Sequence, residues 1–119
     1  MPECTKCNAP LRPNVLMFGD WDWMSERSDA QEARYRQWLR DVSGMKLAII
    51  EIGSGLGVPT LRHECERVLS DHIGRAHLIR VNPREQELLS QAAMVKDKLG
   101  GKGVVPVRLG ALEALRQLL

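Results

Sequence analysis

Residues 46–59, KLAIIEIGSGLGVP, form the stretch from which most of the fold can be inferred. Its strand candidate, Leu47–Ile52, opens with the unbroken apolar run LAII, so we expect both faces of this strand to be covered. Gly53 and Gly55 allow the backbone to turn tightly and a ligand to approach it closely, and Pro59 fits the first turn of a helix. Backbone amides at the start of a helix face anions or sugar hydroxyls. This strand–loop–helix pattern is typical of a nucleotide-binding site.

The rest of the chain alternates between strand and helix patterns. Further strands are predicted at residues 15–18, 76–81 and 104–109, and helices at residues 28–42, 59–74, 85–99 and 111–119. The first of these helices has a capping box, with Ser28 as the cap and Gln31 three residues later. Strands that alternate with helices indicate a parallel α/β sheet. We therefore expect an α/β fold in a single domain over residues 1–119.

Length and composition restrict the class of protein. A chain of 119 residues is long enough for one domain with a hydrophobic core and too short for two ordinary ones. Its 44% hydrophobic and 27% charged residues are typical of a soluble globular protein. It has no apolar run of the roughly 18 to 20 residues that span a bilayer, and its N-terminus does not resemble a secretory signal. We therefore expect a cytoplasmic location and no membrane partner.

The charge pattern gives no indication of a polyanionic partner. The net charge is only +2, and the basic residues are interspersed with acidic ones. Such a pattern is typical of a solvated surface, so no nucleic-acid partner is expected. A zinc ribbon that binds nucleic acid would rest on one cysteine pair alone.

The three cysteines include one closely spaced pair. Cys4 and Cys7 form a CxxC motif, whereas Cys65 falls within a predicted helix and is interpreted as a small core residue. Without a secretory signal, the pair favours metal binding or redox chemistry over a disulfide framework. Two thiolates at this spacing can supply half of a tetrahedral zinc site. An unligated turn and a redox pair, which would normally open a helix after a strand, are the alternatives.

Three separated segments stand out, in this order. They are Cys4-x-x-Cys7 followed by residues 11–20, LRPNVLMFGD; residues 52–59, IGSGLGVP; and residues 78–82, LIRVN. Together they resemble the carboxy-terminal half of the sirtuins, the NAD-dependent protein deacylases. The first is similar to the family's second zinc cysteine pair and its RPxVVxFGE segment, the second to the GTSLxVxP loop, and the third to the xxIN strand end. The resemblance covers nearly the whole chain. It implies a partial Rossmann-like, three-layer parallel sheet, preceded over residues 1–13 by the remnant of a zinc-binding module.

The resemblance assigns cofactor contacts to residues that follow the strands. Gly53 and Ser54 would contact the ribose and phosphates of NAD, and Asn82 would contact the adenosine ribose. Gly110 and Ala111, at the turn before the last helix, would lie against adenine. These assignments place the adenosine side of the cofactor at one edge of the sheet.

The resemblance also implies a peptide groove and a metal site. Val15, Phe18 and Gly19 would line the groove in which an acylated peptide adds as a strand, a mode of recognition that relies on backbone hydrogen bonds. Cys4 and Cys7 would be two of the four ligands of a structural zinc ion. The implied cofactors are therefore NAD and a half-site for Zn²⁺, and the implied partner is an acylated protein or peptide.

The sequence departs from the family pattern at several positions. Gly55, which would also lie in the cofactor site, stands where the family has serine, so one hydroxyl that could bond the nucleotide is missing. Asp20 replaces the usual glutamate. The segment Trp21-Asp22-Trp23 is unlike the ordinary pattern. It indicates a divergent, bacterial-type branch with a different groove rim, or tryptophans that simply pack on the domain.

No catalytic residue is assigned. In the family, the glycine-rich pyrophosphate loop, the catalytic histidine and the other cysteine pair belong to the amino-terminal half, for which this chain has no counterpart. The histidines of this chain fall in a predicted helix and strand and are interpreted as surface or structural residues: His63, His72 and His77. Whether the chain is an enzyme by itself stays open.

Two functions from different classes follow. The chain is expected to be the NAD-adenosine and acyl-peptide portion of a sirtuin-like deacylase, a fragment of a longer protein that is inactive alone. The alternative is a non-catalytic module that binds NAD or ADP-ribose, or that mediates an interaction. Missing sheet strands would leave an apolar edge unpaired, so self-association through that edge is also expected.

Overall fold

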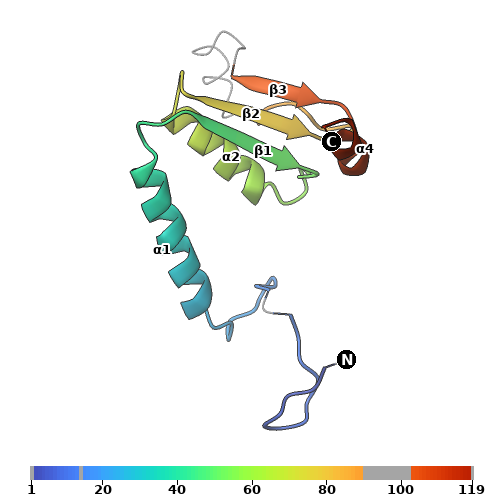
Figure 1. Ribbon diagram of the computed structural model, residues 1–119. Helices are drawn as coiled ribbons and strands as arrows, with labels where there is room; N and C mark the ends of the chain where they lie inside the picture. Colours follow the sequence, from blue (N-terminus) through green and yellow to red (C-terminus); the bar gives the residue numbers. More distant parts are fainter. Residues whose placement is uncertain (1, 14, 90–102, 119) are drawn as a thin grey trace. The chain divides into compact units, whose positions relative to one another are not determined.

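The computed structural model describes residues 2–13, 15–89 and 103–118, and the chain divides into two compact units, Met1–Trp38 and Leu39–Leu119 (Figure 1). We describe each unit by itself. Helix α1 (Glu26–Asp41) crosses the boundary between them.

The second unit has an α/β fold built on a three-stranded parallel sheet, with strand order β1-β2-β3. Its strands and helices are β1 (Leu47–Ile52), α2 (Thr60–Asp71), β2 (Ala76–Val81), β3 (Val104–Val107) and α4 (Ala111–Leu118). The strands predicted at residues 47–52 and 76–81 are confirmed over their full length. The last strand ends at Val107, two residues earlier than expected. The predicted end of the last helix at Leu119 lies outside the described residues.

Strands β1 and β2 are joined by α2 and pair in parallel, from Leu47 opposite Ala76 to Ile52 opposite Val81. Their carboxyl ends therefore meet at the same edge of the sheet. Strand β3 continues this arrangement, with Val107 opposite Val81. Figure 1 shows the three arrowheads pointing the same way, towards α4.

Helix α2 packs against one face of the sheet and forms the apolar core there. The core consists of Cys65 and Leu69 from α2 and Ala76 and Leu78 from β2. Partly buried side chains surround it: Leu47, Ile49, Leu88 and Val104. Apolar residues three to four positions apart on α2 meet alternate residues of the strands, which is the pattern expected where a helix covers a sheet.

The opposite face of the sheet is exposed in the described part of the chain. Ile50 is 62% exposed and Ile52 40%, and Val105 on β3 is 45% exposed. The prediction that both faces of residues 47–52 are covered is therefore wrong for these residues. The apolar run LAII misled because it conceals the two-residue period, in which Leu47, Ile49 and Glu51 face α2. Of the expected three layers, the described residues show the sheet and the α2 layer.

In the first unit, the CxxC segment forms a tight turn. The Cys4 amide donates to the Ala9 carbonyl, and the Asn8 amide donates to the Cys4 carbonyl, each at 2.8 Å. Asn8 has a φ of +58°, a left-handed conformation that asparagine tolerates better than most residues. Glu3 and Pro10 close the turn as an isolated antiparallel bridge.

The strand predicted at residues 15–18 is not formed. The backbone there makes local turns instead, because the Val15 amide donates to the Pro13 carbonyl at 2.8 Å and the Asp20 amide donates to the Met17 carbonyl at 3.2 Å. The Arg12 side chain donates to the Val15 carbonyl at 2.8 Å, which removes another group from any strand ladder. Polar groups that are bonded locally are not available to a neighbouring strand.

Helix α1 begins earlier than predicted. Ser25, and not Ser28, precedes its first residue, and the Asp29 amide donates to the Ser25 carbonyl at 2.8 Å. The Ser25 hydroxyl also donates to the Asp29 carboxylate at 2.7 Å. Glu26 and Asp29 place negative charge in the first turn, where it stabilises the helix dipole. The capping box predicted at Ser28 was therefore placed three residues too late.

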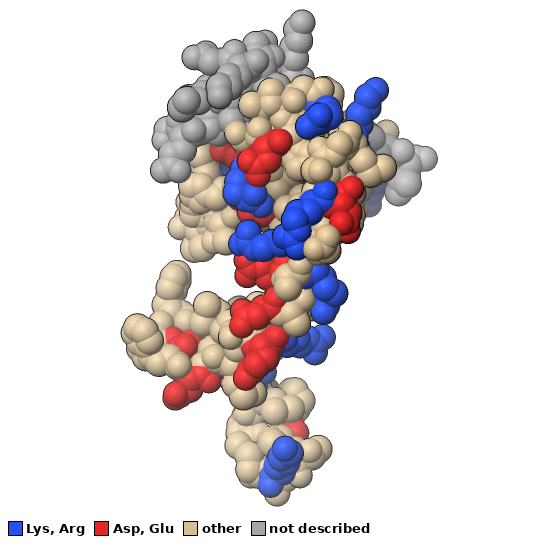
Figure 2. Space-filling model, turned by 90° about the vertical axis from the view of Figure 1, so that its left-hand side faces the viewer, with Lys and Arg blue, Asp and Glu red and all other residues tan. Residues whose placement is uncertain are grey.

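On the face that Figure 2 presents, the charged side chains of the described residues are of both signs. Acidic and basic side chains lie side by side there. On α1, for example, Arg36 donates to Glu32 one turn earlier, at 2.8 Å from Nε. No helix of the described residues is long and apolar enough to cross a bilayer.

Candidate functional site

The candidate site lies at the carboxyl ends of β1 and β2, where the glycine loop follows β1. Gly53 has a φ of +75°, a conformation that residues with a Cβ rarely adopt. Its amide donates to the Val81 carbonyl at 2.9 Å, so the loop begins directly beside the end of β2. The sheet edge and the positive φ together explain why a glycine occurs at this position.

Asn82 joins the loop after β1 to the segment after β2. Its side-chain Nδ2 donates to the Ser54 carbonyl at 3.0 Å, and its Oδ1 accepts from the backbone amides of Arg84 and Glu85, each at 3.0 Å. The residue is 8% exposed. Both lone pairs of Oδ1 are therefore used, and one Nδ2 hydrogen has no acceptor among the described residues. The predicted site residues Ser54 and Asn82 do lie together, and Asn82 also has a structural role.

The mouth of the loop carries a carboxylate. Glu85 Oε2 accepts the Leu56 amide at 3.1 Å and lies 3.6 Å from the position that a Cβ on Gly55 would take. The Ser54 hydroxyl is buried and has no hydrogen-bond partner within the described ranges. A buried hydroxyl without a partner is uncommon in proteins, and here it lies in the loop for which a ligand was predicted.

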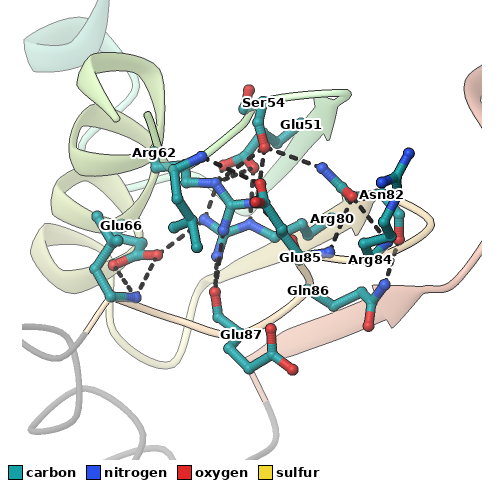
Figure 3. Close-up of polar contacts among 12 residues, drawn as sticks. Glu51, Ser54, Arg62, Glu66, Arg80, Asn82, Arg84, Glu85, Gln86 and Glu87 are labelled. Carbon is teal, nitrogen blue, oxygen red and sulfur yellow. Dashed lines mark hydrogen bonds and ion pairs between the residues drawn. The ribbon is translucent and has the colours of Figure 1, made fainter. Parts of the chain in front are cut away.

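Beneath this edge lies a buried network of charged side chains (Figure 3). Arg80 and Glu51 form two parallel hydrogen bonds, from Nε to Oε1 at 2.7 Å and from Nη2 to Oε2 at 2.8 Å. Nη2 of Arg80 also donates to Glu66 Oε1 on α2 at 2.9 Å. The network therefore links two strands and the helix that covers them.

A second buried arginine, Arg62 on α2, binds backbone carbonyls from both loops of the site. Its Nε and Nη2 donate to the Ser54 carbonyl at 3.0 and 2.7 Å. Nη2 also donates to the Glu85 carbonyl, and Nη1 donates to the Glu87 carbonyl at 3.2 Å. Arg80 reaches the same Glu87 carbonyl at 2.6 Å through its Nη1. Figure 3 shows the two guanidinium groups next to each other beneath the loop.

The four charges of this network balance. Arg62 and Arg80 are fully buried, and Glu51 and Glu66 are 2% and 5% exposed. Burial alone would lower the pKa of Arg80, but hydrogen bonds to the carboxylates of Glu51 and Glu66 more than offset this effect and raise it. Such pairs cost desolvation energy, and removing one partner leaves an uncompensated buried charge.

The network also affects its apolar neighbour, Cys65. Burial, and next the negative charge of Glu51, raise the pKa of this thiol to about 11. A thiol with such a pKa is almost entirely protonated at neutral pH and reacts slowly. The structure thus agrees with the interpretation of Cys65 as a core residue.

The helix predicted at residues 85–99 is absent over residues 85–89, and residues 90–99 lie outside the described part of the chain. The Glu66 carboxylate accepts the Leu89 amide at 3.1 and 3.2 Å. The carbonyls of Glu85 and Glu87 accept from the buried arginines. Side chains of α2 and β2 form hydrogen bonds with these backbone groups. The segment therefore has an irregular conformation and not a helical one.

The interpretation of charged residues as a solvated surface missed this network, although the sequence carries a signal for it. Glu51 follows Leu47 and Ile49 at two-residue spacing, so it falls on the same strand face as the core. Arg80 follows Ala76 and Leu78 in the same way. On α2, Arg62 and Glu66 precede the core residues Cys65 and Leu69 by three positions each. Charges at core positions on three neighbouring elements point to a buried ionic network.

The other predicted cofactor residues follow β3. The Asn82 amide donates to the Val107 carbonyl at 3.0 Å, so the ends of β2 and β3 lie side by side. Gly110 follows the end of β3, and its carbonyl accepts the Ala114 amide at 3.0 Å as α4 begins with Ala111. Gly110 and Ala111 are both exposed and follow the carboxyl end of β3.

The predicted peptide-groove residues belong to the first unit and are exposed there. Phe18 is 97% exposed, Val15 is 56% exposed, and Gly19 adopts a φ of +74° in a turn. Arg12 forms an ion pair with Asp20 across this segment. Val15, Phe18 and Gly19 are neighbours in the sequence, and the described residues of the first unit form no strand there.

The predicted metal residues lie at the surface. Cys4 is partly exposed and Cys7 exposed, and both are free thiols. The backbone amides of Lys6 and Cys7, and then the Cys7 side chain, lower the pKa of Cys4 by hydrogen bonding. Among the described residues, no three His, Cys, Asp or Glu side chains are grouped as a metal site would need. The pair alone offers two thiolate ligands.

The histidines lie away from the loop or on the surface. His72, at the carboxyl end of α2, is buried, and its Nδ1 lies 2.9 Å from the Val68 carbonyl. Because a carbonyl can only accept, Nδ1 carries the hydrogen. His77 is exposed near the amino end of β2, and His63 is exposed in the first turn of α2. These positions agree with their interpretation as surface and structural residues.

Comparison with protein-family models, with curated protein sequences and with solved structures gives no significant match. The geometry of the loop and the network is therefore the basis for a functional proposal.

Proposed function

We propose that the carboxyl edge of the sheet binds the adenosine side of NAD, as part of a sirtuin-like NAD-dependent protein deacylase. The observation that carries the proposal is the hydrogen bond of 3.0 Å from Asn82 Nδ2 to the Ser54 carbonyl. It joins the two segments for which nucleotide contacts were expected, at the ends of adjacent parallel strands. In open α/β sheets, ligands bind outside the carboxyl ends of the strands.

The chemistry of the edge fits a sugar. Glycine backbone at Gly53 and Gly55, the buried Ser54 hydroxyl and the free Nδ2 hydrogen of Asn82 offer hydrogen bonds to hydroxyl groups. The Glu85 carboxylate, whose side chain is 38% exposed, adds an acceptor for ribose hydroxyls. Gly110 and Ala111, at the end of β3, would supply the flat surface for adenine. The Rossmann-like character of the sheet, with a third layer on the exposed face, belongs to the same proposal.

Titration calorimetry with NAD, ADP-ribose and adenosine tests the proposal. We expect all three to bind, and weakly, because the adenosine side provides only part of the contacts of a dinucleotide. Replacing Ser54 with alanine should weaken each of them, because it removes the only hydroxyl that the loop offers. The same replacement at Ser70, a partly buried serine of α2 remote from the loop, is the matched control. The proposal would be refuted if millimolar ligand produced no heat in calorimetry and no change in the amide chemical shifts measured by NMR.

A non-catalytic nucleotide-binding module is the second candidate. It is favoured by the placement of two of the three histidines, His72 and His77, which lie towards the amino end of β2 and not at the loop. The third, His63, is exposed in the first turn of α2. Both candidates share the same nucleotide site and differ only in whether turnover occurs. An assay that detects nicotinamide release from NAD in the presence of an acetylated peptide separates them.

The peptide groove and the zinc half-site are parts of the first candidate. In it, Val15, Phe18 and Gly19 would bind the acylated peptide, and Cys4 and Cys7 would hold zinc with two further ligands from elsewhere. We expect less than one zinc per chain after gel filtration. If two cysteine pairs combine, the expected value is one zinc per two chains. One tightly held zinc in each monomer would show that the half-site description is wrong.

A further inference from the structure

Arg62 is the one side chain of the described network that touches both segments of the proposed nucleotide site. It is fully buried on the first turn of α2, between the loop after β1 and the segment after β2. Its guanidinium donates to the Ser54 carbonyl on one side and to the carbonyls of Glu85 and Glu87 on the other. Ser54 and Asn82 are 28 residues apart in the sequence, so no local turn can fix the separation of the two segments.

The planar guanidinium suits this task. Five N–H donors in a fixed plane can bind carbonyls on two sides at once, which a lysine ammonium on its flexible stem cannot do with the same geometry. The charge of Arg62 is balanced below by Glu51, whose Oε1 lies 4.0 Å from its Nε, and above by Glu85, whose Oε2 lies 3.8 Å from its Nη2. Glu85 in turn accepts the Leu56 amide, so the contact continues into the glycine loop.

The two segments differ in the hydrogen bonds that hold them. The Glu87 carbonyl has a second arginine, because Arg80 donates to it at 2.6 Å. Among the described residues, the Ser54 carbonyl accepts from Asn82 besides Arg62, and Asn82 belongs to the proposed ligand-binding surface itself. Removal of Arg62 would therefore leave the Ser54 carbonyl to Asn82, while the segment after β2 keeps the bond from Arg80 to the Glu87 carbonyl.

We propose that Arg62 is a positioning residue of the nucleotide site, which holds the Ser54 loop and the Asn82–Glu87 segment at the separation that a ligand requires. The proposal rests on the proposed function for the identity of the ligand. A site whose two sides are already in place loses less conformational freedom on binding. Arg62 itself touches no ligand in this arrangement.

The test combines the variant R62K, which keeps the charge, with amide hydrogen exchange and calorimetry on the whole chain. In the ligand-free protein we expect R62K to speed exchange of the Leu56 amide at least about tenfold. The Leu78 amide, which donates to the Gly103 carbonyl within the sheet, should not change. Binding of NAD and ADP-ribose should weaken about tenfold or more, equivalent to about 1.4 kcal/mol. The matched control, R67K on the exposed side of the same helix, should change neither quantity.

A second measurement needs no variant. Because Nε of Arg62 is buried and bonded, its N–H signal should be visible by NMR at neutral pH before any ligand is added. A signal that appears only with ligand would show that the two segments are not held in advance, and would overturn the proposal. Loss of the sheet in R62K would overturn it too, since Arg62 would then be needed for the fold itself.

The outcomes separate this proposal from the proposed function. If the wild-type protein binds neither NAD nor ADP-ribose, the proposed function fails, while exchange at Leu56 and the Arg62 signal still report on the positioning. If the wild-type protein binds and R62K binds equally well with unchanged exchange at Leu56, only the positioning role fails.

Discussion

Glu51 and Arg80 stand opposite each other in the register of β1 and β2, and their side chains meet through two hydrogen bonds without access to water. A bidentate arginine–carboxylate pair fixes orientation as well as distance. Here the pair lies between the apolar core and the polar carboxyl ends of the strands. Above it lie Arg62 and the two loops of the proposed site.

Replacing Arg80 with methionine should lower the free energy of unfolding by about 3 kcal/mol, because Glu51 and Glu66 would remain buried without their shared partner. Urea denaturation followed by circular dichroism measures this. R67Q, which breaks exposed pairs with Glu64 and Asp71 on the same helix, should cost less than about 1 kcal/mol. Equal stability of R80M and wild type would contradict the buried pair.

Cys4 should react with iodoacetamide much faster than Cys65 in the folded protein. The pKa of Cys65 is raised to about 11 by burial and by Glu51, whereas that of Cys4 is lowered by backbone amides. Each pKa unit changes the thiolate fraction at neutral pH about tenfold, so we expect a rate ratio above about a hundred. Mass spectrometry of peptides measures it. In concentrated urea the two rates should converge, and comparable rates without urea would disprove the assignment.

The carboxyl group of Asp20 should titrate below its ordinary range of about 3.9, because its hydrogen bond to Arg12 lowers its pKa. Since the pKa is lower in the folded state, the stabilisation is present above the unfolded value and disappears as the pH falls through the folded one. Carbon-detected NMR titration of Asp20 in wild type and R12Q measures the effect. R12Q should raise the pKa of Asp20 towards its ordinary value and R12K should raise it less. An identical titration in all three proteins would remove Arg12 as the cause.

Self-association should depend on the exposed face and outer edge of β1. Replacing Ile50, which is 62% exposed, with lysine places a charge on the apolar face and should shift the protein towards the 13.4 kDa monomer. Sedimentation velocity at several concentrations detects the shift. I73K changes another exposed isoleucine, after α2, and should leave association unchanged. A wild-type protein that is monomeric at all concentrations would refute this prediction.

The position of the sheet was largely predictable from the sequence. The strands Leu47–Ile52 and Ala76–Val81 are short apolar runs bounded by glycine or proline, and Cys65 and Leu69 recur at helical spacing. The sequence did not predict the conformation of residues 85–89, because it depends on Arg80 and Arg62, which are 7 and 25 residues away from the Glu87 carbonyl that both bind. Helix propensity is a local quantity, and buried side chains that bind backbone carbonyls override it.

The candidate site was predictable in part. Ser54 and Asn82 were expected to lie together, and they do. The role of Asn82 in binding the Ser54 carbonyl, and the charged network beneath it, were not expected. Charged residues were interpreted as solvated because surface positions are their commonest location. The strand register is what places Glu51 and Arg80 inside.

The bonds of Arg62 to Ser54, Glu85 and Glu87 end on main-chain oxygens. Every amino acid carries such an oxygen, so these bonds do not depend on which side chains occupy the three positions. Substitutions at Ser54 or Glu87 can therefore alter what the edge recognises while the bonds to Arg62 persist. Within this small unit, the capacity to acquire a new ligand is therefore partly separated from the requirement to stay folded.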